Sequence, residues 1–577
     1  MSQSDFEKRK EMLAELVYYV FDSFIIPLIR SNFHVTESNA HRNRLFYFRH
    51  DVWRHLTEPT IAELKCTTYE EMKPVEARKV LSSRTFGYST IRLLPKATGF
   101  RPIANLRRRM LTWHNGKKVL GRSINSLLTP TFKVLDYEKV RTSLNNPRPN
   151  APSETNPRQT QHPAHLGASL FSAAEAHARL RAFAAAQHAS RRGRPLFFAK
   201  VDVSACFDTV PQAKLLDVVA ALLASENYQV EQHAMVKARG GAGVPPRVRF
   251  FAKGCAAAGR AQAAAGGAAG GAAAPAAADR VFVGPLARQS VRRQQVLESL
   301  ASHVRQNLVR LGKKYYVQRR GIPQGSVVSS LLVNVFYGRL EAEVLGWERE
   351  PAASSSAAAD GKPDYLLMRL IDDFLLVTTS RARAEAFLRV LHRGVPEYGV
   401  AVKPEKSLAN FAVTIDGRPV PRCDAATFPY CGLAIDVRSL EIRKESGPAV
   451  ASGAGSTAAD ALTVEFSSAP GRSFQRRALN AFKIRMHAMF VDSAFNSLEV
   501  VAANLFAGFR EAALRMLSYV RCLPATKRPS TKLIVGKSHF SFYSREISVF
   551  RASPLEARLR ERGNGRSNCF VQLETRN

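Results

Sequence analysis

Two adjacent carboxylates, Asp372 and Asp373, interrupt a long apolar run at residues 365–380, YLLMRLIDDFLLVTTS. Each flank is long enough for a buried strand, so we predict a β-hairpin that carries both aspartates at its tip. Neighbouring carboxylates repel each other, and burying them is costly unless a cation, a proton or solvent neutralises the charge. The pair therefore predicts a divalent-metal site, and a solvated Asp-Asp turn between two strands is the alternative.

A third carboxylate, Asp202, ends a second predicted buried strand in LFFAKVDVSACFDTV, residues 196–210. A lone strand end of this kind is usually structural, but this strand could lie beside the Asp372 hairpin. Three carboxylates from two adjacent strands can hold two magnesium ions about 3.5 to 4 Å apart. That is the geometry of nucleotidyl transfer.

A basic hairpin is predicted at residues 91–106, IRLLPKATGFRPIANL, with its turn around Thr98 and Gly99. Its two arms would project Lys96 and Arg101. An ammonium and a guanidinium so placed can clamp a triphosphate, the first as a point charge and the second as a fork. A solvated basic hairpin is the alternative.

Residues 316–341, YVQRRGIPQGSVVSSLLVNVFYGRLE, predict a strand, a turn and a helix that Ser326 could cap. Gly325 in this turn would let a base pair approach the backbone closely. An ordinary strand-to-helix turn has the same pattern.

Charge points to a polyanionic partner. The 577 residues include 84 Lys and Arg against 48 Asp and Glu, a net charge of +36, which indicates nucleic acid. Residues 16–29 are interrupted by Asp22 and Pro27, so we expect them to be too short and too polar to span a bilayer. Seven cysteines without a CxxC pair favour a reducing compartment and indicate neither a zinc site nor a disulfide framework.

The remaining segments predict the surroundings of these motifs. Residues 8–30 have helical spacing and an apolar face expected to pack inside a helical domain, and residues 32–56 interleave aromatic and basic side chains. Residues 141–194 read as a loop or linker with one Ala-rich helix, without assigned chemistry. Residues 212–314 interrupt the motifs, with helical flanks, above all at 291–311, and a disordered Ala- and Gly-rich centre at 255–278. Helices are also expected at 381–394 and 475–521, with a hairpin at FPYCGLAIDVRSLEI.

The order of LLPKxxGFRPI, VDVSACFD, GIPQGSVVS, LIDDFLLVT, VKPEKS and PYCGL resembles the polymerase core of reverse transcriptases. More narrowly, FHVTE with RLFYFRHDVW, YVQRRGIPQGS, the insertion before it and FPYCGLAIDVRSLEI are similar to the telomerase reverse transcriptase family. The resemblance covers about residues 8–520 and favours the metal site over the solvated turn. It implies an α+β right-hand polymerase fold with fingers, an antiparallel-sheet palm, a helical RNA-binding tail and a helical thumb.

The resemblance also implies a domain order. We expect the end of the RNA-binding domain at 1–85, fingers at 86–195, a palm at 196–445 with an insertion at about 212–314, and a thumb at 446–577. We further expect the chain to lack the amino-terminal domain of the family and most of its RNA-binding domain, and the thumb to be incomplete.

Residue roles follow from matching positions in the motifs. Asp202, Asp372 and Asp373 would hold two Mg²⁺ ions, and Lys406 would lie near the leaving pyrophosphate. Nucleotide contacts would come from Lys96, Arg101, Phe207, Gln324 and Gly325, with Phe207 sensing the sugar. The resemblance assigns the primer grip to Cys431, Gly432 and Leu433, and RNA binding to Phe33, Thr36, Glu37, Phe46 and Tyr47.

These roles imply an RNA-templated DNA polymerase that extends chromosome 3′ ends in the nucleus, at telomeres. Its partners would be telomerase RNA, a telomeric single-stranded DNA 3′ end, deoxynucleoside triphosphates and accessory telomere proteins, but no membrane. One alternative is the reverse transcriptase of a mobile element, which is disfavoured because no endonuclease, integrase or ribonuclease H segment is evident. The other is a truncated, inactive RNA-binding scaffold.

Overall fold

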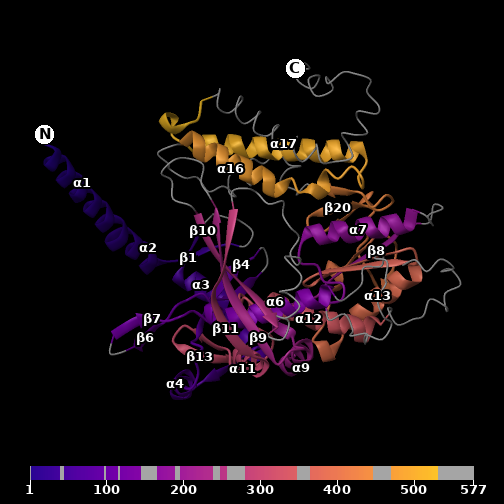
Figure 1. The fold of residues 1–577 in the computed structure, drawn as a ribbon, viewed down its shortest axis with the longest axis horizontal. Helices are drawn as coiled ribbons and strands as arrows, with labels where there is room; N and C mark the ends of the chain where they lie inside the picture. The colour runs from indigo at the N-terminus through magenta and orange to yellow at the C-terminus, as the bar shows by residue number, and fades with distance from the viewer. Residues whose placement is uncertain are drawn as a thin grey trace.

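A computed structural model describes residues 2–38, 45–96, 99–114, 117–144, 166–188, 195–237, 247–256, 280–346, 364–445 and 470–530. Figure 1 shows the elements around β8 and α13, those around β4 and β13, and the two long helices α16 and α17. Most of the predicted disordered centre of the insertion, and the chain after residue 530, lie outside the described residues.

A four-stranded antiparallel sheet contains the predicted carboxylate strands. Its order is β14-β15-β8-β16, formed by β14 Tyr365–Leu370, β15 Asp373–Thr378, β8 Phe197–Asp202 and β16 Leu408–Ala409. Phe374 and Leu376 point into one core and Leu375 and Val377 into another. Burial on both faces explains why the strands read as continuous apolar runs, and it confirms the predicted hairpin.

Helices cover one face of this sheet. α9 Gln212–Leu222, α12 Ser329–Leu340 and α13 Arg381–Arg393 supply the first core, which confirms the helix predicted at 381–394. Helix α12 begins at Ser329 with Val328 as its N-cap, so the predicted cap by Ser326 is wrong. The Ser326 hydroxyl is engaged elsewhere, 2.9 Å from Nε2 of the buried His303.

The other face of the sheet carries α7 and a small second sheet. α7 Ala173–His188 is the predicted Ala-rich helix, and the small sheet contains β19 Thr427–Tyr430, β20 Leu433–Asp436 and β21 Ile442–Lys444. Side chains from both contribute to the second core. The hairpin predicted at FPYCGLAIDVRSLEI is therefore confirmed.

The basic hairpin belongs to a five-stranded sheet of order β3-β13-β12-β4-β5. Its strands are β3 Tyr69–Met72, β4 Ser89–Pro95, β5 Phe100–Ala104, β12 Leu308–Leu311 and β13 Lys314–Gln318. β12 pairs with β4 in parallel, so this sheet draws strands from both sides of the border expected between fingers and palm. The domain borders themselves stay predictions.

The insertion is mainly a β structure. β9 Asn227–Lys237, β10 Arg247–Ala256 and β11 Arg280–Arg292 form an antiparallel sheet, followed by α11 Arg293–Arg305. The prediction of helical flanks is thus confirmed for α9, at the start of the insertion, and for α11, and it is wrong for the three strands between them. The reason lies in period-two burial, since Tyr228, Val230 and Ala234 are buried at even spacing along β9.

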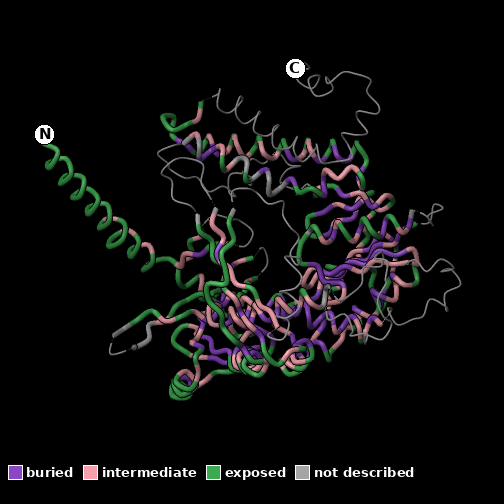
Figure 2. Tube along the Cα trace, viewed as in Figure 1, coloured by how far each residue is buried: buried purple, intermediate pink, exposed green. Residues whose placement is uncertain are grey.

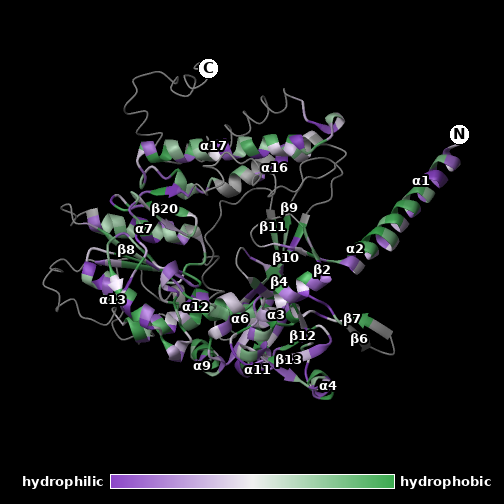
Figure 3. Ribbon diagram, turned by 180° about the vertical axis from the view of Figure 1, so that it is seen from behind, coloured by the Kyte–Doolittle hydropathy of each residue, from purple (hydrophilic) through white to green (hydrophobic). Residues whose placement is uncertain are grey.

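The chain opens with a long helix, α1 Gln3–Tyr18, which continues through a π-helical segment, Tyr19–Ile25, into α2 Ile26–Asn32. The predicted helix is confirmed, but its apolar face is exposed rather than packed against described residues (Figures 2 and 3). Gln3–Asn32 is also long and apolar enough to cross a membrane, judged by length and composition only. The expectation drawn from residues 16–29 alone was therefore wrong about this segment.

Strands β1 Phe33–Glu37 and β2 Leu45–Arg49 and helix α3 His50–Thr67 follow this helix. At the other end of the described chain, α16 Pro470–Arg485 and α17 Leu498–Arg521 pack together, which confirms the helices predicted at 475–521. Asn504 of α17 anchors the pair on β21, donating to the Ile442 carbonyl at 2.9 Å and accepting from the Lys444 amide at 3.1 Å.

Candidate active site

Strand register brings the three predicted carboxylates together. Asp373, the first residue of β15, is the direct antiparallel partner of Asp202, the last residue of β8. Directly opposed residues in such a ladder have Cα atoms about 4.5 to 5.5 Å apart. Asp372 occupies the turn, and its carbonyl accepts a hydrogen bond of 3.1 Å from the Val203 amide. The prediction that Asp202 meets the hairpin tip is confirmed.

Burial makes the negative charge of this cluster costly. It raises the pKa of Asp372 and Asp373, and the nearby Asp202 carboxylate raises both further. Two ammonium groups offset part of the charge. Lys406 Nζ lies 2.5 Å from Asp202 Oδ2, and Lys200 Nζ lies 3.8 Å from Asp373 Oδ1.

The residue types fit a divalent cation after side-chain rotation. Over the described ranges, no three His, Cys, Asp or Glu side chains converge on one point ready for an ion. The Asp202 carboxylate instead faces Lys406, while Asp373 faces Lys200 and accepts from the Cys431 thiol at 3.7 Å. Carboxylate oxygens are the preferred ligands of Mg²⁺, and backbone register already groups the three aspartates. Rotation about their side-chain bonds is the change that a shared ion requires.

The positive charges of Lys96, Arg101, Lys403 and Lys406 act on one another. Burial lowers the pKa of Lys96, and the charges of Arg101, Lys406 and Lys403 lower it further. The basic hairpin and the residue-406 segment therefore act on one another electrostatically. A polyanion such as a triphosphate would relieve this repulsion.

The turn after β13 forms hydrogen bonds with the segment that follows β8 and with strand β5. Gln324 Nε2 donates to Asp208 Oδ2 at 2.9 Å, and the Gln324 carbonyl accepts from the Ala104 amide of β5 at 3.4 Å. Gly325 has φ +105°, and a Cβ there would lie 2.8 Å from the Ala104 carbonyl oxygen. Only glycine fits this approach without strain. The two predicted nucleotide contacts thus lie beside the basic hairpin.

Phe207 and Asp208 lie on the short helix α8 Cys206–Thr209, directly after the β8 carboxylate. Phe207 is half-buried against the first core, and its carbonyl accepts from the Ile322 amide at 2.7 Å. Asp208 was missed as a site residue by sequence reasoning. The signal available was an acidic residue within a few positions of Asp202, next to the predicted sugar contact.

Asp208→Asn is expected to stabilise the chain at pH 8 and to change its stability little at pH 4. Burial raises the pKa of Asp208, even though Gln324, Lys96 and Arg101 oppose the shift. The stability that this group contributes is therefore full below its unfolded pKa and is lost as the pH rises through the folded value. Asparagine does not titrate. Thermal unfolding of both proteins at the two pH values tests this, and a Tm advantage that is larger at pH 4 would contradict it.

The predicted primer grip forms the turn between β19 and β20. Cys431 and Gly432 both have left-handed backbone, with φ of +50° and +80°. Burial raises the pKa of the Cys431 thiol to about 12, and the thiol contacts Asp373. The hydroxyl of the preceding Tyr430 donates to the Asp373 carbonyl at 3.2 Å. Cys431 and Gly432 therefore lie at the carboxylate cluster, with Leu433 buried at the start of β20.

The predicted RNA-binding residues share the β1–β2 hairpin, in which Thr36 pairs with Phe46 and Val35 with Tyr47. Phe33 and Tyr47 are exposed and meet edge to face, with ring centroids 6.5 Å apart. Glu37 forms a 2.7 Å ion pair with Arg92 of β4, linking this hairpin to the five-stranded sheet. Thr36 is only 2% exposed, so it supports the hairpin and offers little surface to a ligand.

Comparison with known proteins shows which proteins this chain is similar to. Residues 1–64 match a family model described as the RNA-binding domain of the telomerase ribonucleoprotein complex. The chain is 30% identical over 549 residues to telomerase reverse transcriptase of Canis lupus familiaris, and 24% identical over 559 residues to that of Oryza sativa subsp. japonica. These alignments cover 90% and 95% of the chain. Over most of its length, the chain is similar to telomerase reverse transcriptases.

The chain spans less than half the length of these curated relatives, 44% of the dog protein and 40% of the rice protein. Its fold is similar to that of telomerase from Candida albicans, solved with a TWJ fragment of telomeric RNA, at a TM-score of 0.59 and 16% identity. That comparison covers 91% of this chain and 70% of the Candida chain. Apo telomerase from Candida tropicalis gives a TM-score of 0.53 at 17% identity, over 89% of this chain and 70% of that one. The predicted α+β right-hand fold of telomerase reverse transcriptase is confirmed.

The family match also bears on the exposed amino-terminal helix. Gln3–Asn32 lies within the residues that match the RNA-binding domain of the telomerase ribonucleoprotein complex. The apolar face that this helix exposes is therefore part of the segment that this family model covers.

Proposed function

We propose that this chain is the catalytic part of an RNA-templated DNA polymerase that extends chromosome 3′ ends with telomeric repeats. The observation that carries the proposal is the register of Asp202 against Asp373, with Asp372 in the adjoining turn. The mobile-element alternative is less well supported, because the named relatives are telomerase reverse transcriptases. We place the enzyme in the nucleus, at telomeres.

Asp202, Asp372 and Asp373 would hold two Mg²⁺ ions, whose chemistry is to neutralise charge on the attacking and leaving oxygens during phosphoryl transfer. The chain's own residues supply the rest. Lys96 and Arg101 would bind the triphosphate. Lys406, beside Asp202, would donate a proton to the leaving pyrophosphate or stabilise its negative charge. The turn at Cys431 and Gly432 would position the primer end next to Asp373.

Telomerase RNA, a telomeric DNA 3′ end and deoxynucleoside triphosphates are the proposed substrates and partners. The net charge of +36 suits two nucleic-acid strands, and the residues that match an RNA-binding domain include the exposed aromatics of β1–β2. Repeat addition to a telomeric primer, with telomerase RNA compared against a scrambled RNA, tests this proposal. Salt-sensitive RNA binding without any Mg²⁺-dependent product would support the scaffold alternative instead.

Lys96→Ala and Arg101→Ala are each expected to raise the apparent KM for nucleotide by about 10-fold or more, because each removes a charge from the triphosphate contact. Primer affinity should change little. Steady-state extension at varied nucleotide concentration measures both quantities. Lys314→Ala is the matched control, since Lys314 is an exposed cation of the same five-stranded sheet, paired with Glu71. Equal effects from all three variants, or effects on primer affinity alone, would make the hairpin a generic basic surface.

Phe207→Ala is expected to lower the preference for deoxynucleotides over ribonucleotides by about 10- to 100-fold. The physical reason is steric, because a ring at this position would collide with a 2′-hydroxyl and alanine would not. The side chain also packs against the first core, so some loss of Tm is expected as well. The ratio of kcat/KM for the two sugars, measured beside Tm, separates the roles. A lower Tm with an unchanged ratio would leave Phe207 as a core residue only.

A further inference from the structure

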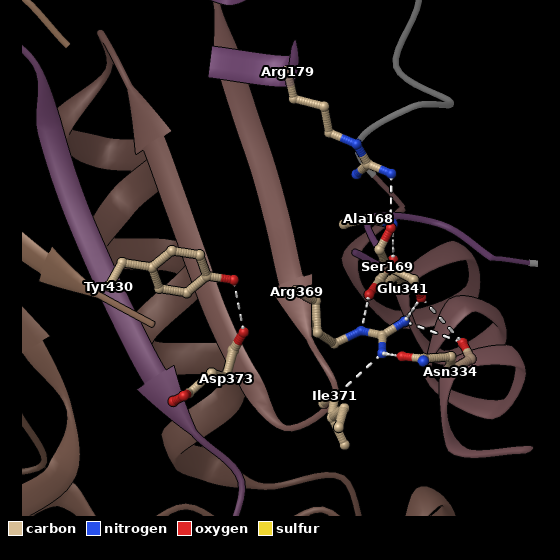
Figure 4. Close-up of polar contacts among 9 residues, drawn as sticks. All are labelled: Ala168, Ser169, Arg179, Asn334, Glu341, Arg369, Ile371, Asp373 and Tyr430. Carbon is tan, nitrogen blue, oxygen red and sulfur yellow. Dashed lines mark hydrogen bonds and ion pairs between the residues drawn. The ribbon is translucent and has the colours of Figure 1, made fainter. Parts of the chain in front are cut away.

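A charged side chain lies completely buried beneath the proposed catalytic turn. Arg369 of β14 has 0% of its surface exposed, and a buried guanidinium is tolerated only when its charge and its N–H groups are satisfied. Nε donates to Glu341 Oε1 at 2.5 Å, and Nη1 donates to Asn334 Oδ1 at 2.9 Å. Nη2 donates to the Ser169 hydroxyl at 2.5 Å and to the Asn334 carbonyl at 3.1 Å. Figure 4 shows these groups converging on the guanidinium.

The fifth N–H of Arg369 is directed at the turn itself. Nη1 also donates to the carbonyl of Ile371 at 3.1 Å, so all five guanidinium donors are used. Ile371 has φ +61°, a left-handed conformation that is unfavourable for a β-branched residue. A strained residue persists only where its surroundings hold it in place. Here the strained residue directly precedes Asp372.

Three consecutive carbonyls of the turn are held in this way, each by a different donor. The Ile371 carbonyl accepts from Arg369, the Asp372 carbonyl from the Val203 amide at 3.1 Å, and the Asp373 carbonyl from the Tyr430 hydroxyl at 3.2 Å. The donors come from β14, the residue after β8, and β19. The main chain on both sides of Asp372 is thus held by three donors, independently of the aspartate side chains. Figure 4 shows two of these contacts, from Arg369 to Ile371 and from Tyr430 to Asp373.

A segment that sequence analysis left without chemistry completes this frame. Ala168 and Leu170 form backbone hydrogen bonds with Arg369 at 2.9 and 2.7 Å, which lays residues 168–170 along the edge of β14. The Ala168 amide also donates to Glu341 Oε2 at 2.6 Å. Gly167 has φ +49°, and a Cβ there would lie 1.9 Å from that same oxygen, so the approach requires glycine. Arg179 of α7 donates to the Ser169 carbonyl at 2.8 Å.

We infer that Arg369 and Tyr430 are positioning residues, which hold the Ile371–Asp373 main chain so that Asp372 and Asp373 meet Asp202 in the geometry that a divalent ion needs. The inference rests on the proposed function. A buried ion pair is weak support for stability in itself, because apolar residues often replace one without loss. Arg369 and Tyr430, however, also donate hydrogen bonds to the carbonyls of the two residues that flank Asp372, and these bonds give both side chains a specific positioning role. Partners that orient metal ligands typically change metal affinity or activity by about 10- to 100-fold when removed.

Two conservative variants test the inference. Arg369→Lys keeps the charge beside Glu341 but cannot reach Asn334, Ser169 and Ile371 together, and Tyr430→Phe removes only the hydroxyl. Arg383→Gln is the control, because Arg383 pairs with Asp364 at the opposite end of the same hairpin, at 2.7 Å. The readouts are Mn²⁺ affinity by calorimetry, kcat, hydrogen exchange of the hairpin tip, and Tm.

Arg369→Lys is expected to weaken Mn²⁺ binding and kcat by about 10- to 100-fold, and Tyr430→Phe by several-fold. Both should speed hydrogen exchange at the tip, whereas the control should leave all three quantities within about 2-fold. Variants that match the control in Mn²⁺ affinity and tip exchange would overturn the inference. If Arg369→Lys does not fold, Ser169→Ala and Tyr430→Phe decide by the same criteria. A parent protein that neither binds Mn²⁺ nor extends a primer would refute the proposed function, while tip exchange still tests the positioning role.

Discussion

Asp372→Asn and Asp202→Asn are each expected to lower primer extension by about 10³-fold or more. Each removes a charge that must face the cations of phosphoryl transfer, and the loss of one preorganised electrostatic group at a reacting centre already costs about 10²- to 10³-fold. The fold should survive. Burial and mutual repulsion raise the pKa of Asp372, so the neutral amide removes a destabilising charge in the absence of metal. Rapid-quench extension and thermal unfolding of the same samples measure both effects.

Asp364→Asn is the matched control for this experiment. Asp364 lies just before β14, is 41% exposed, and pairs with Arg383 rather than with the carboxylate cluster. It should retain nearly full activity. Extension by Asp372→Asn at the parent rate, or an equal loss in the control, would remove the cluster from the chemistry.

Lys406→Ala is expected to lower kcat by about 10²- to 10³-fold, within the range for loss of a general acid. It should also lower the Tm without metal, because Asp202 would lose the ammonium that offsets the charge of the cluster. The hydrogen bond to Asp202 raises the pKa of Lys406, so this contribution is full at neutral pH and is lost only as the pH rises through the folded value. Saturating Mg²⁺ should restore the Tm but not kcat.

Lys403→Ala provides the comparison. Lys403 is an exposed cation in the same segment and acts on Lys96, but no bond to an aspartate of the cluster involves it among the described residues. A small effect from Lys403→Ala beside a large one from Lys406→Ala supports the assigned role. A Lys406→Ala enzyme with parental kcat would contradict it.

The carboxylate hairpin was predictable because its signal is local. Two apolar runs around Asp372 and Asp373 can bury both faces only in the middle of a covered sheet, and the strand that ends at Asp202 carries the same pattern. The order of the motifs along the chain then indicated that these two strands, which lie far apart in the sequence, are neighbours in the sheet. Register confirmed it to the residue.

The supports of the site were not predictable, since they depend on contacts across long stretches of chain. In the sequence, Arg369 interrupts an apolar strand and resembles a surface charge. Its partners become evident only in the fold, where Asn334 of α12 and Glu341 of the following π-helical segment, Glu341–Leu345, contact it. Ser169 belongs to a segment without periodicity, and its place beside β14 follows only from the fold. The strands of the insertion were not predicted. They flank the Ala- and Gly-rich centre, which has no periodic pattern, although β9 itself has period-two burial.

Single-turnover extension of a pre-annealed RNA–DNA hybrid by the purified chain tests the central claim most directly, because it does not depend on separate capture of a template RNA. The account predicts Mg²⁺-dependent incorporation of the nucleotide complementary to the RNA template. It also predicts that the Asp372→Asn protein, which should still bind the hybrid, incorporates none. A parent chain that binds the hybrid but adds no nucleotide at saturating Mg²⁺, or an Asp372→Asn protein that adds it normally, would contradict the claim.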